Sequence, residues 1–162
     1  MKIMGIDPGF DRLGFAFIEK NPGQKEVILN SGTITTDKKE THPKRFSYIR
    51  GELVKILEKE KPDIVGVESI LFSNNQKTAV LVSGVRGVIL EVLGSYDFDV
   101  IEVNPKTVKL SVTGSGSSDK KAILKILPKI IAFPEKKMLD DEVDAIAIAL
   151  TTSTLSTFPQ KA

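Results

Sequence analysis

Three apolar runs rich in β-branched and aromatic residues follow one another at the start of the chain. They cover residues 2–7, 14–19 and 26–35, and the turn sequences Pro8-Gly9 and Asn21-Pro22-Gly23 separate them. Runs of this length and composition, bounded by Gly and Pro, are typical of β-strands. Because such short connections join antiparallel neighbours, we expect the first three strands to form an antiparallel meander.

The remainder of the chain alternates between helical and strand patterns. In the first helical pattern, apolar residues recur from Phe46 to Leu57, between Thr41 as the expected N-cap and Lys61-Pro62 as the expected end. Strands that alternate with helices are expected to be parallel, because a helical crossover joins parallel neighbours. The remaining predicted elements are strands at residues 63–68 and 98–103 and helices at residues 76–93, at residues 105–110, from residue 119 and from about residue 140.

This order of elements predicts an α/β fold with a mixed five-stranded sheet flanked by helices. The 162 residues, 41% of them hydrophobic and 27% charged, suit one globular domain, expected at residues 1–155 with a frayed tail at residues 156–162. The start of the chain lacks the apolar core of a signal peptide, and no apolar run approaches the roughly 18 residues that span a bilayer. We therefore expect a cytoplasmic protein without membrane contact. The absence of cysteine excludes disulfides and thiolate metal sites.

The formal net charge of +2 is not that of a strongly basic nucleic-acid-binding domain. Positive charge is nevertheless concentrated at residues 105–125, where five lysines are opposed only by Asp119. Such a stretch can face the phosphates of a nucleic acid, although a solvated charged surface has the same composition. The five residues are Lys106, Lys109, Lys120, Lys121 and Lys125.

Acidic residues stand at three places that the predicted fold can bring together. Asp7 ends the first strand, Glu68 ends the fourth, and Asp141 and Asp144 lie at the start of the last helix. If the first and fourth strands are adjacent and parallel, their acids leave the sheet at one edge, and the i, i+3 spacing puts both aspartates on one helical face. Clustered carboxylates need a cation, and oxygen ligands favour Mg²⁺ or Mn²⁺. Singly, each could instead be an ordinary turn, strand-end or helix-start acid.

Short motifs follow one another in a fixed order along residues 2–152. They are Gly5-Ile6-Asp7-Pro8-Gly9 with Leu13-Gly14, Val67-Glu68-Ser69, the helical stretch at residues 76–88, Asn104-Pro105-Lys106-Thr107-Val108-Lys109, the loop at residues 113–120, and the helix start at residues 141–149. A lone Asp-Pro-Gly would be a weak signal, but the series is specific. In this order the motifs resemble those of the RuvC Holliday junction resolvases, a family of the RNase H-like superfamily.

The resemblance implies that Asp7, Glu68, Asp141 and Asp144 are the catalytic and metal-binding residues. It implies two Mg²⁺ ions per active site during catalysis, with Mn²⁺ as a substitute. Two such ions about 4 Å apart can activate a water and stabilise the leaving oxygen of a phosphodiester. Asp140 adjoins Asp141, but the Asp-x-x-Asp-Ala register favours Asp141.

The resemblance also implies residues that contact DNA. Lys109 and Lys120 align with basic residues near the scissile phosphate, where a cation can stabilise developing charge. Three positions after Glu68, where many members carry an aromatic residue, this chain has Leu71, with Phe72 next. Phe72 could stack on an exposed base at the crossover or belong to the core, and both interpretations stay open.

A homodimeric endonuclease that resolves four-way DNA junctions by paired symmetric nicks, in DNA recombination and repair, is the function that the resemblance implies. It further implies a branch-migration motor as a partner and a preference for short T-containing sequences. In the helix at residues 76–93, the apolar surface extends beyond one face through Val80, Val88 and Leu93, and Gly84 and Gly87 would permit close approach of a twin helix. The alternatives are a monomeric RNA-processing nuclease of the YqgF type and a module that binds junctions without cutting them.

Overall fold

The first three strands form the expected antiparallel meander. A computed structural model of the chain describes residues 1–69, 76–133 and 137–156. The strands are β1 (Lys2–Asp7), β2 (Arg12–Glu19) and β3 (Val27–Thr35), with β1 against β2 and β2 against β3. β2 begins two residues earlier than predicted, because its pairing with β3 continues to Arg12 opposite Thr35.

Two parallel strands complete the sheet on the other side of β1. β4 (Ile64–Glu68) pairs with β1, and β5 (Val100–Val103) pairs with β4, in the order β3-β2-β1-β4-β5. The mixed five-stranded sheet predicted from the sequence is therefore confirmed. β5 begins two residues later than expected.

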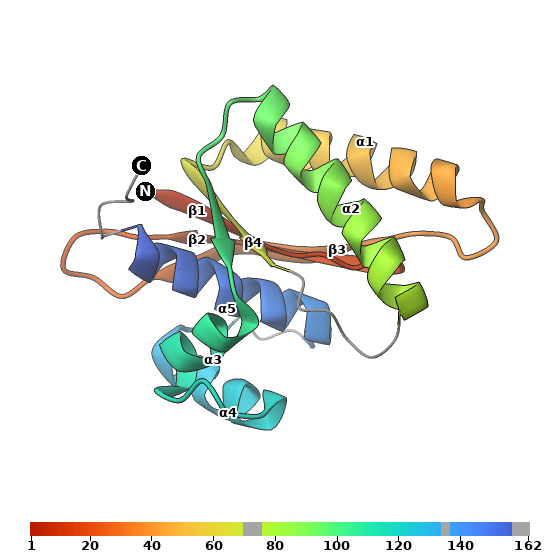
Figure 1. Ribbon diagram of the computed structural model, residues 1–162. Coiled ribbons are helices and arrows are strands. Elements are labelled where there is room, and N and C mark those ends of the chain that lie inside the picture. Colours follow the sequence, from red (N-terminus) through yellow and green to blue (C-terminus); the bar gives the residue numbers. More distant parts are fainter. Residues whose placement is uncertain (70–75, 134–136, 157–162) are drawn as a thin grey trace.

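Helices cover both faces of the sheet (Figure 1). On one face lie α1 (His42–Glu60) and α2 (Gln76–Ser95). On the other lies α5 (Asp140–Leu155), with α3 (Pro105–Thr113) and α4 (Lys120–Ile130) beyond it.

Helix boundaries depart from the expected ones where local capping decides them. Thr41 occupies the N-cap position of α1 but makes no side-chain capping hydrogen bond, so that expectation holds for position only. α3 continues three residues further than predicted, because the left-handed residue that ends it is Gly114, with φ of 77°. Asp119 caps α4 by accepting a hydrogen bond from the backbone N–H of Ala122.

The strands present different side chains to the two helical layers. In β1, Met4 and Ile6 pack with α1 and α2, whereas Ile3 packs with α5. In β4, Val65 and Val67 pack on the α1 side. The alternation of a pleated strand thus fixes which residues can face α5.

Glycines let α5 lie unusually close to the sheet. A Cβ atom at Gly5 would stand 2.2 Å from the carbonyl oxygen of Ala145, and one at Gly66 would stand 1.8 Å from Thr152 Oγ1. Both separations are far below van der Waals contact, so only glycine fits at these two positions.

One expectation about apolar runs is wrong. The segment Thr78–Ser95 of α2 is long and apolar enough to cross a membrane by length and composition. In this fold its residues Val85, Ile89, Val92 and Leu93 are fully buried in the core that α2 shares with α1 and the sheet. Length and composition alone do not show that a helix crosses a membrane, because core helices of other proteins can be equally long and apolar.

Candidate active site

Asp7 and Glu68 lie beside each other at the carboxyl edge of the sheet. The parallel pairing of β1 with β4 aligns Ile6 with Val67, and the next residue of each strand is one of the two acids. Since Ile6 and Val67 pack on the α1 side, the alternation turns both carboxylates toward α5. The strand-end juxtaposition expected from the sequence is therefore present.

The first turns of α5 bring further acids to this edge. Asp144 Oδ2 accepts a hydrogen bond from Lys120 Nζ at 2.7 Å, and the same ammonium group lies 3.8 Å from Asp140 Oδ2. Glu142 is buried and accepts a hydrogen bond from Ser31 Oγ at 3.1 Å. This bond ties the start of α5 to β3 and so helps to fix the position of the acids that flank it.

Burial and mutual repulsion raise the pKa values of Asp7, Glu68 and Asp144. The pKa of Asp7 rises from 3.8 to about 7, first because the carboxyl is buried and then because Glu68, Asp144 and Asp141 repel its negative charge. The pKa of Glu68 rises from 4.5 to about 7, again through burial first and the charge of Asp144 second. Burial also raises the pKa of Asp144, against the hydrogen bond from Lys120. The carboxylates thus form one electrostatic cluster, whose ionised form a cation would stabilise.

Two lysines bring positive charge to the same place. Burial alone would lower the pKa of Lys120, but its hydrogen bond with Asp144 and the attraction of that carboxylate outweigh burial and raise the pKa. Lys109 and Lys120 line a cleft of about 170 Å³ together with Glu68 and Asp144. A phosphate in this cleft would lie beside both cationic groups and acids, and the cationic groups are suited to stabilising the charge that develops during hydrolysis.

Asp141 is held by a different cation. Its Oδ2 lies 2.8 Å from Arg12 Nε, yet among the described residues this buried oxygen has no hydrogen-bond partner. The two atoms are close enough for an ion pair, but the N–H group is not directed at the oxygen. One oxygen of Asp141 therefore keeps unused capacity as a ligand.

The donor set fits a divalent cation that prefers oxygen ligands. Among the residues that the structure describes, no three acidic or histidine side chains already stand close enough to hold one ion together. Lys120 and Arg12 instead accompany the two aspartates of α5. Burial raises the pKa of Asp7 and Glu68, and one buried aspartate oxygen lacks a hydrogen bond, as in a site that a bound cation would stabilise.

Every predicted site residue within the described part of the chain lies at this edge. The side chain of Asp140 is 70% exposed. Phe72 and Leu71, predicted to act at the junction core, lie outside the described residues. The residues brought together are Asp7, Glu68, Asp141, Asp144, Lys109 and Lys120.

Sequence reasoning missed the residues that position the acids. Gly5 and Gly66 stand two positions before Asp7 and Glu68, on the same face of the sheet, and admit α5. The available signal was glycine inside an otherwise apolar strand, which often marks a close approach of backbone. Arg12 was also missed, because nothing in its sequence context distinguishes it from a surface charge.

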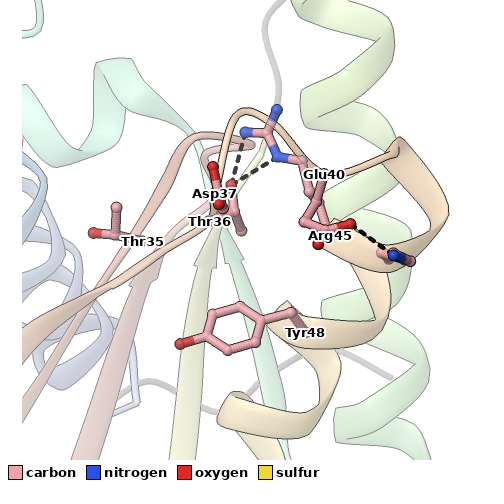
Figure 2. Close-up of a pocket in the computed structure, with 7 residues that line it drawn as sticks. Thr35, Thr36, Asp37, Glu40, Arg45 and Tyr48 are labelled. Atoms are coloured by element: carbon pink, nitrogen blue, oxygen red, sulfur yellow. Dashed lines mark hydrogen bonds and ion pairs between the residues drawn. The ribbon is translucent and has the colours of Figure 1, made fainter.

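A larger cavity of about 440 Å³ lies between β3 and α1 (Figure 2), and the described residues that line it include none of the four predicted acids. Arg45 forms one wall, and its guanidinium donates to Thr36 Oγ1, to the carbonyl oxygen of Phe10 and, at 2.5 Å, to Asp11 Oδ1. These bonds tie the turn after Asp7 to the start of α1. Arg45 therefore serves to hold the turn that follows the acid.

Comparisons with known proteins agree with this site. Residues 3–152 match the family described as crossover junction endodeoxyribonuclease RuvC. Proteins of that name from Thermosipho melanesiensis and Brachyspira hyodysenteriae are each 40% identical to this chain, covering 92% and 93% of it and 94% and 92% of their own lengths. The Thermus thermophilus RuvC structure in complex with a Holliday junction substrate is 26% identical, with a TM-score of 0.88 over 96% of this chain and 94% of that one.

A more distant structure shares the fold alone. The yeast mitochondrial Holliday junction resolvase Ydc2 superimposes with a TM-score of 0.69 at 14% identity, over 92% of this chain and 77% of that one. The RNase H-like fold expected from the sequence is thus confirmed. All four predicted acids and both predicted lysines lie within the matched residues, and the chain belongs to the RuvC family of crossover junction endodeoxyribonucleases.

Proposed function

We propose that this chain binds four-way DNA junctions and resolves them by hydrolysing one phosphodiester bond in each of two strands, at symmetric positions. The observation that carries the proposal is the meeting of Asp7, Glu68 and Asp144 on one face of the sheet, with Lys120 in contact. Family membership and the Holliday junction bound to the Thermus thermophilus relative support the choice of substrate.

Asp7, Glu68, Asp141 and Asp144 are the residues that would hold Mg²⁺, with Mn²⁺ as a substitute and two ions per site during catalysis. When bound, these ions supply Lewis-acid activation of a water and stabilisation of the leaving oxygen. Two of the acids are fixed by paired strands and two by a helix packed directly on glycine, so their spacing is set by backbone. Such rigidity suits a site whose ligands must be held in place.

The lysines are placed to act on the phosphate. Lys109 and Lys120 line the cleft between α3, α4 and α5, where their charges can neutralise the non-bridging oxygens as negative charge grows in the transition state. The described residues that line this cleft carry no hydroxyl or thiol group. Water is therefore the proposed nucleophile: its oxygen bonds to phosphorus as the bond to the leaving oxygen breaks, without a covalent enzyme intermediate.

A homodimer would match the two-fold symmetry of the junction. α2 is the proposed interface, because it leaves apolar surface uncovered: Val80 is 70% exposed. Val88 lines a groove of about 470 Å³ between α1 and α2, together with Phe46, Gly84 and Gly87. A Cβ at Gly84 would stand 2.7 Å from the ring of Phe46, whereas at Gly87 it would meet nothing within 4 Å. Gly84 thus serves packing within the chain, and Gly87 is the open approach for a twin helix.

The interface has a direct test. Val88→Asp should convert the dimer to monomers at micromolar concentration, since an unpaired charge in a buried contact is strongly unfavourable. Ser95→Asp, on the same helix but outside the groove, is the matched control and should remain dimeric. Light scattering that finds the unmodified protein monomeric would defeat the interface and the paired mechanism that depends on it.

The wider setting follows from family membership. We propose a cytoplasmic enzyme that works with a branch-migration motor in DNA recombination and repair, and that prefers short T-containing sequences at the cut. Cleavage of junctions that differ only at the crossover sequence would test the preference. Co-purification with the motor would test the partnership.

The decisive assay compares a synthetic four-way junction with a linear duplex of the same sequence, with Mg²⁺ and with chelator. We expect paired nicks in the junction with Mg²⁺ and intact DNA in the other three arms. Equal cutting of the linear duplex would contradict structure selectivity. Cutting of RNA in place of the junction would favour an RNA-processing nuclease, and tight binding without cutting would favour a junction-binding module.

A further inference from the structure

Arg12 contacts the acidic cluster from β2, which borders β1 on the side away from β4. It is the first residue of β2, and its Nε lies 2.8 Å from Asp141 Oδ2. Lys120 holds the other aspartate of α5, Asp144, at 2.7 Å. The two aspartates, one helical turn apart, are therefore each accompanied by a tethered cation, one from β2 and one from α4.

The backbone fixes Arg12 in this place. A Cβ at Gly9 would stand 2.0 Å from the carbonyl oxygen of Arg12, and a Cβ at Gly14 would stand 2.0 Å from that of Asp141. The backbone of the turn between β1 and β2 therefore packs tightly against the backbone of Arg12. The backbone of β2 likewise contacts the start of α5. The pairing of Arg12 with Asp141 follows from this packing.

The guanidinium of Arg12 is accessible to solvent and has N–H donors that Asp141 does not occupy. The Arg12 side chain is 44% exposed, and among the described residues Asp141 is its one assigned polar partner. It lines a second cleft, of about 320 Å³, with Gly9, Thr78 and Asp141. A guanidinium carries five N–H donors in a planar fork that suits the paired oxygens of a phosphate.

The ion pair itself is poorly aligned. Asp141 Oδ2 makes no hydrogen bond in spite of the short distance to Arg12 Nε. A misaligned, partly exposed ion pair is weak and exchanges readily when either partner is offered a better one. A divalent cation is the better partner for the carboxylate, and a phosphate is the better partner for the guanidinium.

We propose that Arg12 is a phosphate-binding residue that leaves Asp141 when that carboxylate ligates a metal ion and then binds a DNA backbone phosphate beside the cut site. The proposal rests on the metal site described above. In the metal-free protein, Arg12 neutralises Asp141 and competes with the ion. In the loaded protein, it extends the positive surface from the lysine cleft across the acids to the β1–β2 turn.

The exchange predicts a metal-dependent change in DNA binding. Junction affinity is measured against salt concentration for the full-length protein and for Arg12→Gln, with Ca²⁺ and with chelator, on junction DNA confirmed intact afterwards. Ca²⁺ is the probe because it takes the same oxygen ligands. With Ca²⁺ the salt slope of Arg12→Gln should be smaller by about one unit, because one phosphate contact is lost. With chelator the two slopes should agree.

Two further variants test whether a change in salt slope comes from a lost phosphate contact or from a loss of charge or of folding. Arg12→Lys should restore the slope in Ca²⁺. Lys55→Gln removes the same charge from an exposed ion pair with Glu52 on α1 and should leave the slope unchanged. Equal slopes for Arg12→Gln and the unmodified protein in Ca²⁺, or an equal loss of slope with and without Ca²⁺, would overturn the proposal.

Metal affinity without DNA is the second readout. Calorimetry with Ca²⁺ alone should find Arg12→Gln tighter by about two- to fivefold, because a competing cation is gone. A merely structural role predicts weaker binding, and weaker binding would overturn the proposal. Asp141→Asn should bind Ca²⁺ at least about tenfold more weakly. Unchanged Ca²⁺ binding by Asp141→Asn would overturn the assignment of Asp141 as a metal ligand. If Asp141→Asn binds Ca²⁺ more weakly but Arg12→Gln leaves the salt slope of junction binding unaltered, only the proposed movement of Arg12 from Asp141 to a phosphate is overturned.

Discussion

The two faces of the central strands differ in the side chains that they carry. The face toward α5 has glycine at two positions, whereas the neighbouring residues on the opposite face are large and apolar. Gly5 and Gly66 meet α5 at distances that no side chain could tolerate, while their strand neighbours Met4 and Val65 fill the core under α1 and α2. At these two pairs of neighbouring positions, the α1 face is filled by side chains, whereas on the α5 face the strand lies directly against the helix. This close approach fixes distances tightly, because Gly5 meets backbone atoms of Ala145 and Ala149 and Gly66 meets the stiff β-branched side chain of Thr152.

The acids belong to the backbone-packed face. Asp7 follows Gly5 by two residues and Glu68 follows Gly66 by two, so each acid continues the row of positions that touches α5. The same helix carries Asp144, whose charge raises the pKa of both. The comparison teaches that stability can be lost on the α1 face without loss of geometry, whereas small changes on the α5 face should alter the chemistry.

The largest expected effect is on catalysis at the acidic edge. Asp7→Asn should slow junction cleavage by at least about a thousandfold, because it removes a negatively charged ligand from the centre of the cluster. Junction binding should remain, since the cationic surface is untouched. A gel assay of cleavage and a mobility-shift assay of binding measure the two. Cleavage by Asp7→Asn at the unmodified rate would mean that the acids are wrongly assigned.

A matched pair of substitutions separates the two faces. Leu53→Ala opens a cavity in the fully buried α1 face and should lower the free energy of unfolding by about 2–5 kcal/mol while leaving the rate per folded molecule unchanged. Gly66→Ala forces α5 away from β4 and should cost about 1–3 kcal/mol in stability. It should also lower the rate per folded molecule. Chemical denaturation gives the stabilities, and active-site titration normalises the rates.

The proposed difference between the two faces is contradicted if Leu53→Ala and Gly66→Ala have the same effect on the cleavage rate. Equal rates per folded molecule for Gly66→Ala and Leu53→Ala would show that the position of α5 does not control the acids.

The lysines should show a smaller effect than the acids. Lys109→Ala and Lys120→Ala should each slow cleavage on the order of a hundredfold at saturating protein, because each removes a charge that stabilises the transition state. Binding should weaken much less. Single-turnover rates and equilibrium binding of the same junction measure the difference. If affinity falls as far as the rate does, the lysines position the DNA and do not act on the reacting phosphate.

The smallest expected effect is on stability as a function of pH. In the unfolded chain Asp7 loses its proton near its ordinary pKa of 3.8, whereas in the folded, metal-free protein it keeps the proton up to about pH 7. The folded state therefore binds more protons in this range, and the contribution of Asp7 to the free energy of unfolding falls as pH rises from about 4 to about 7. Asp7→Asn should remove that fall. The full shift corresponds to about 4 kcal/mol, and because the carboxyl is only partly buried we expect about half of this, about 2 kcal/mol, as the gain in stability at pH 7.

Thermal denaturation in chelator, at pH 4 and at pH 7, measures the difference between the two proteins. Asp99→Asn, an exposed acid before β5, is the control and should show no such gain. A gain that is the same at both pH values would assign the effect of Asp7→Asn to something other than its protonation.

Much of this site could be predicted from the sequence, and the reasons are particular. Strand ends at Asp7 and Glu68 follow from apolar runs that stop, and the parallel direction of β4 and β5 follows from the helix between them. The placement of β4 beside β1 was a condition of the expected site and did not follow from the sequence. The i, i+3 aspartates follow from helical spacing alone. What could not be predicted depends on distance between elements: the glycines matter because of what α5 places opposite them, and Arg12 matters because Asp141 lies within 2.8 Å.

The placement of the ions relative to the two faces can be measured directly. Crystals of the full-length protein grown with Mn²⁺ and recorded near the manganese absorption edge should show anomalous density on the α5 face, within ligand distance of both Asp7 and Glu68. We expect anomalous density at this place in crystals of the unmodified protein and its loss in crystals of Asp7→Asn. Ordered Mn²⁺ found only elsewhere on the protein, at concentrations that support cleavage, would contradict an active site built on the α5 face.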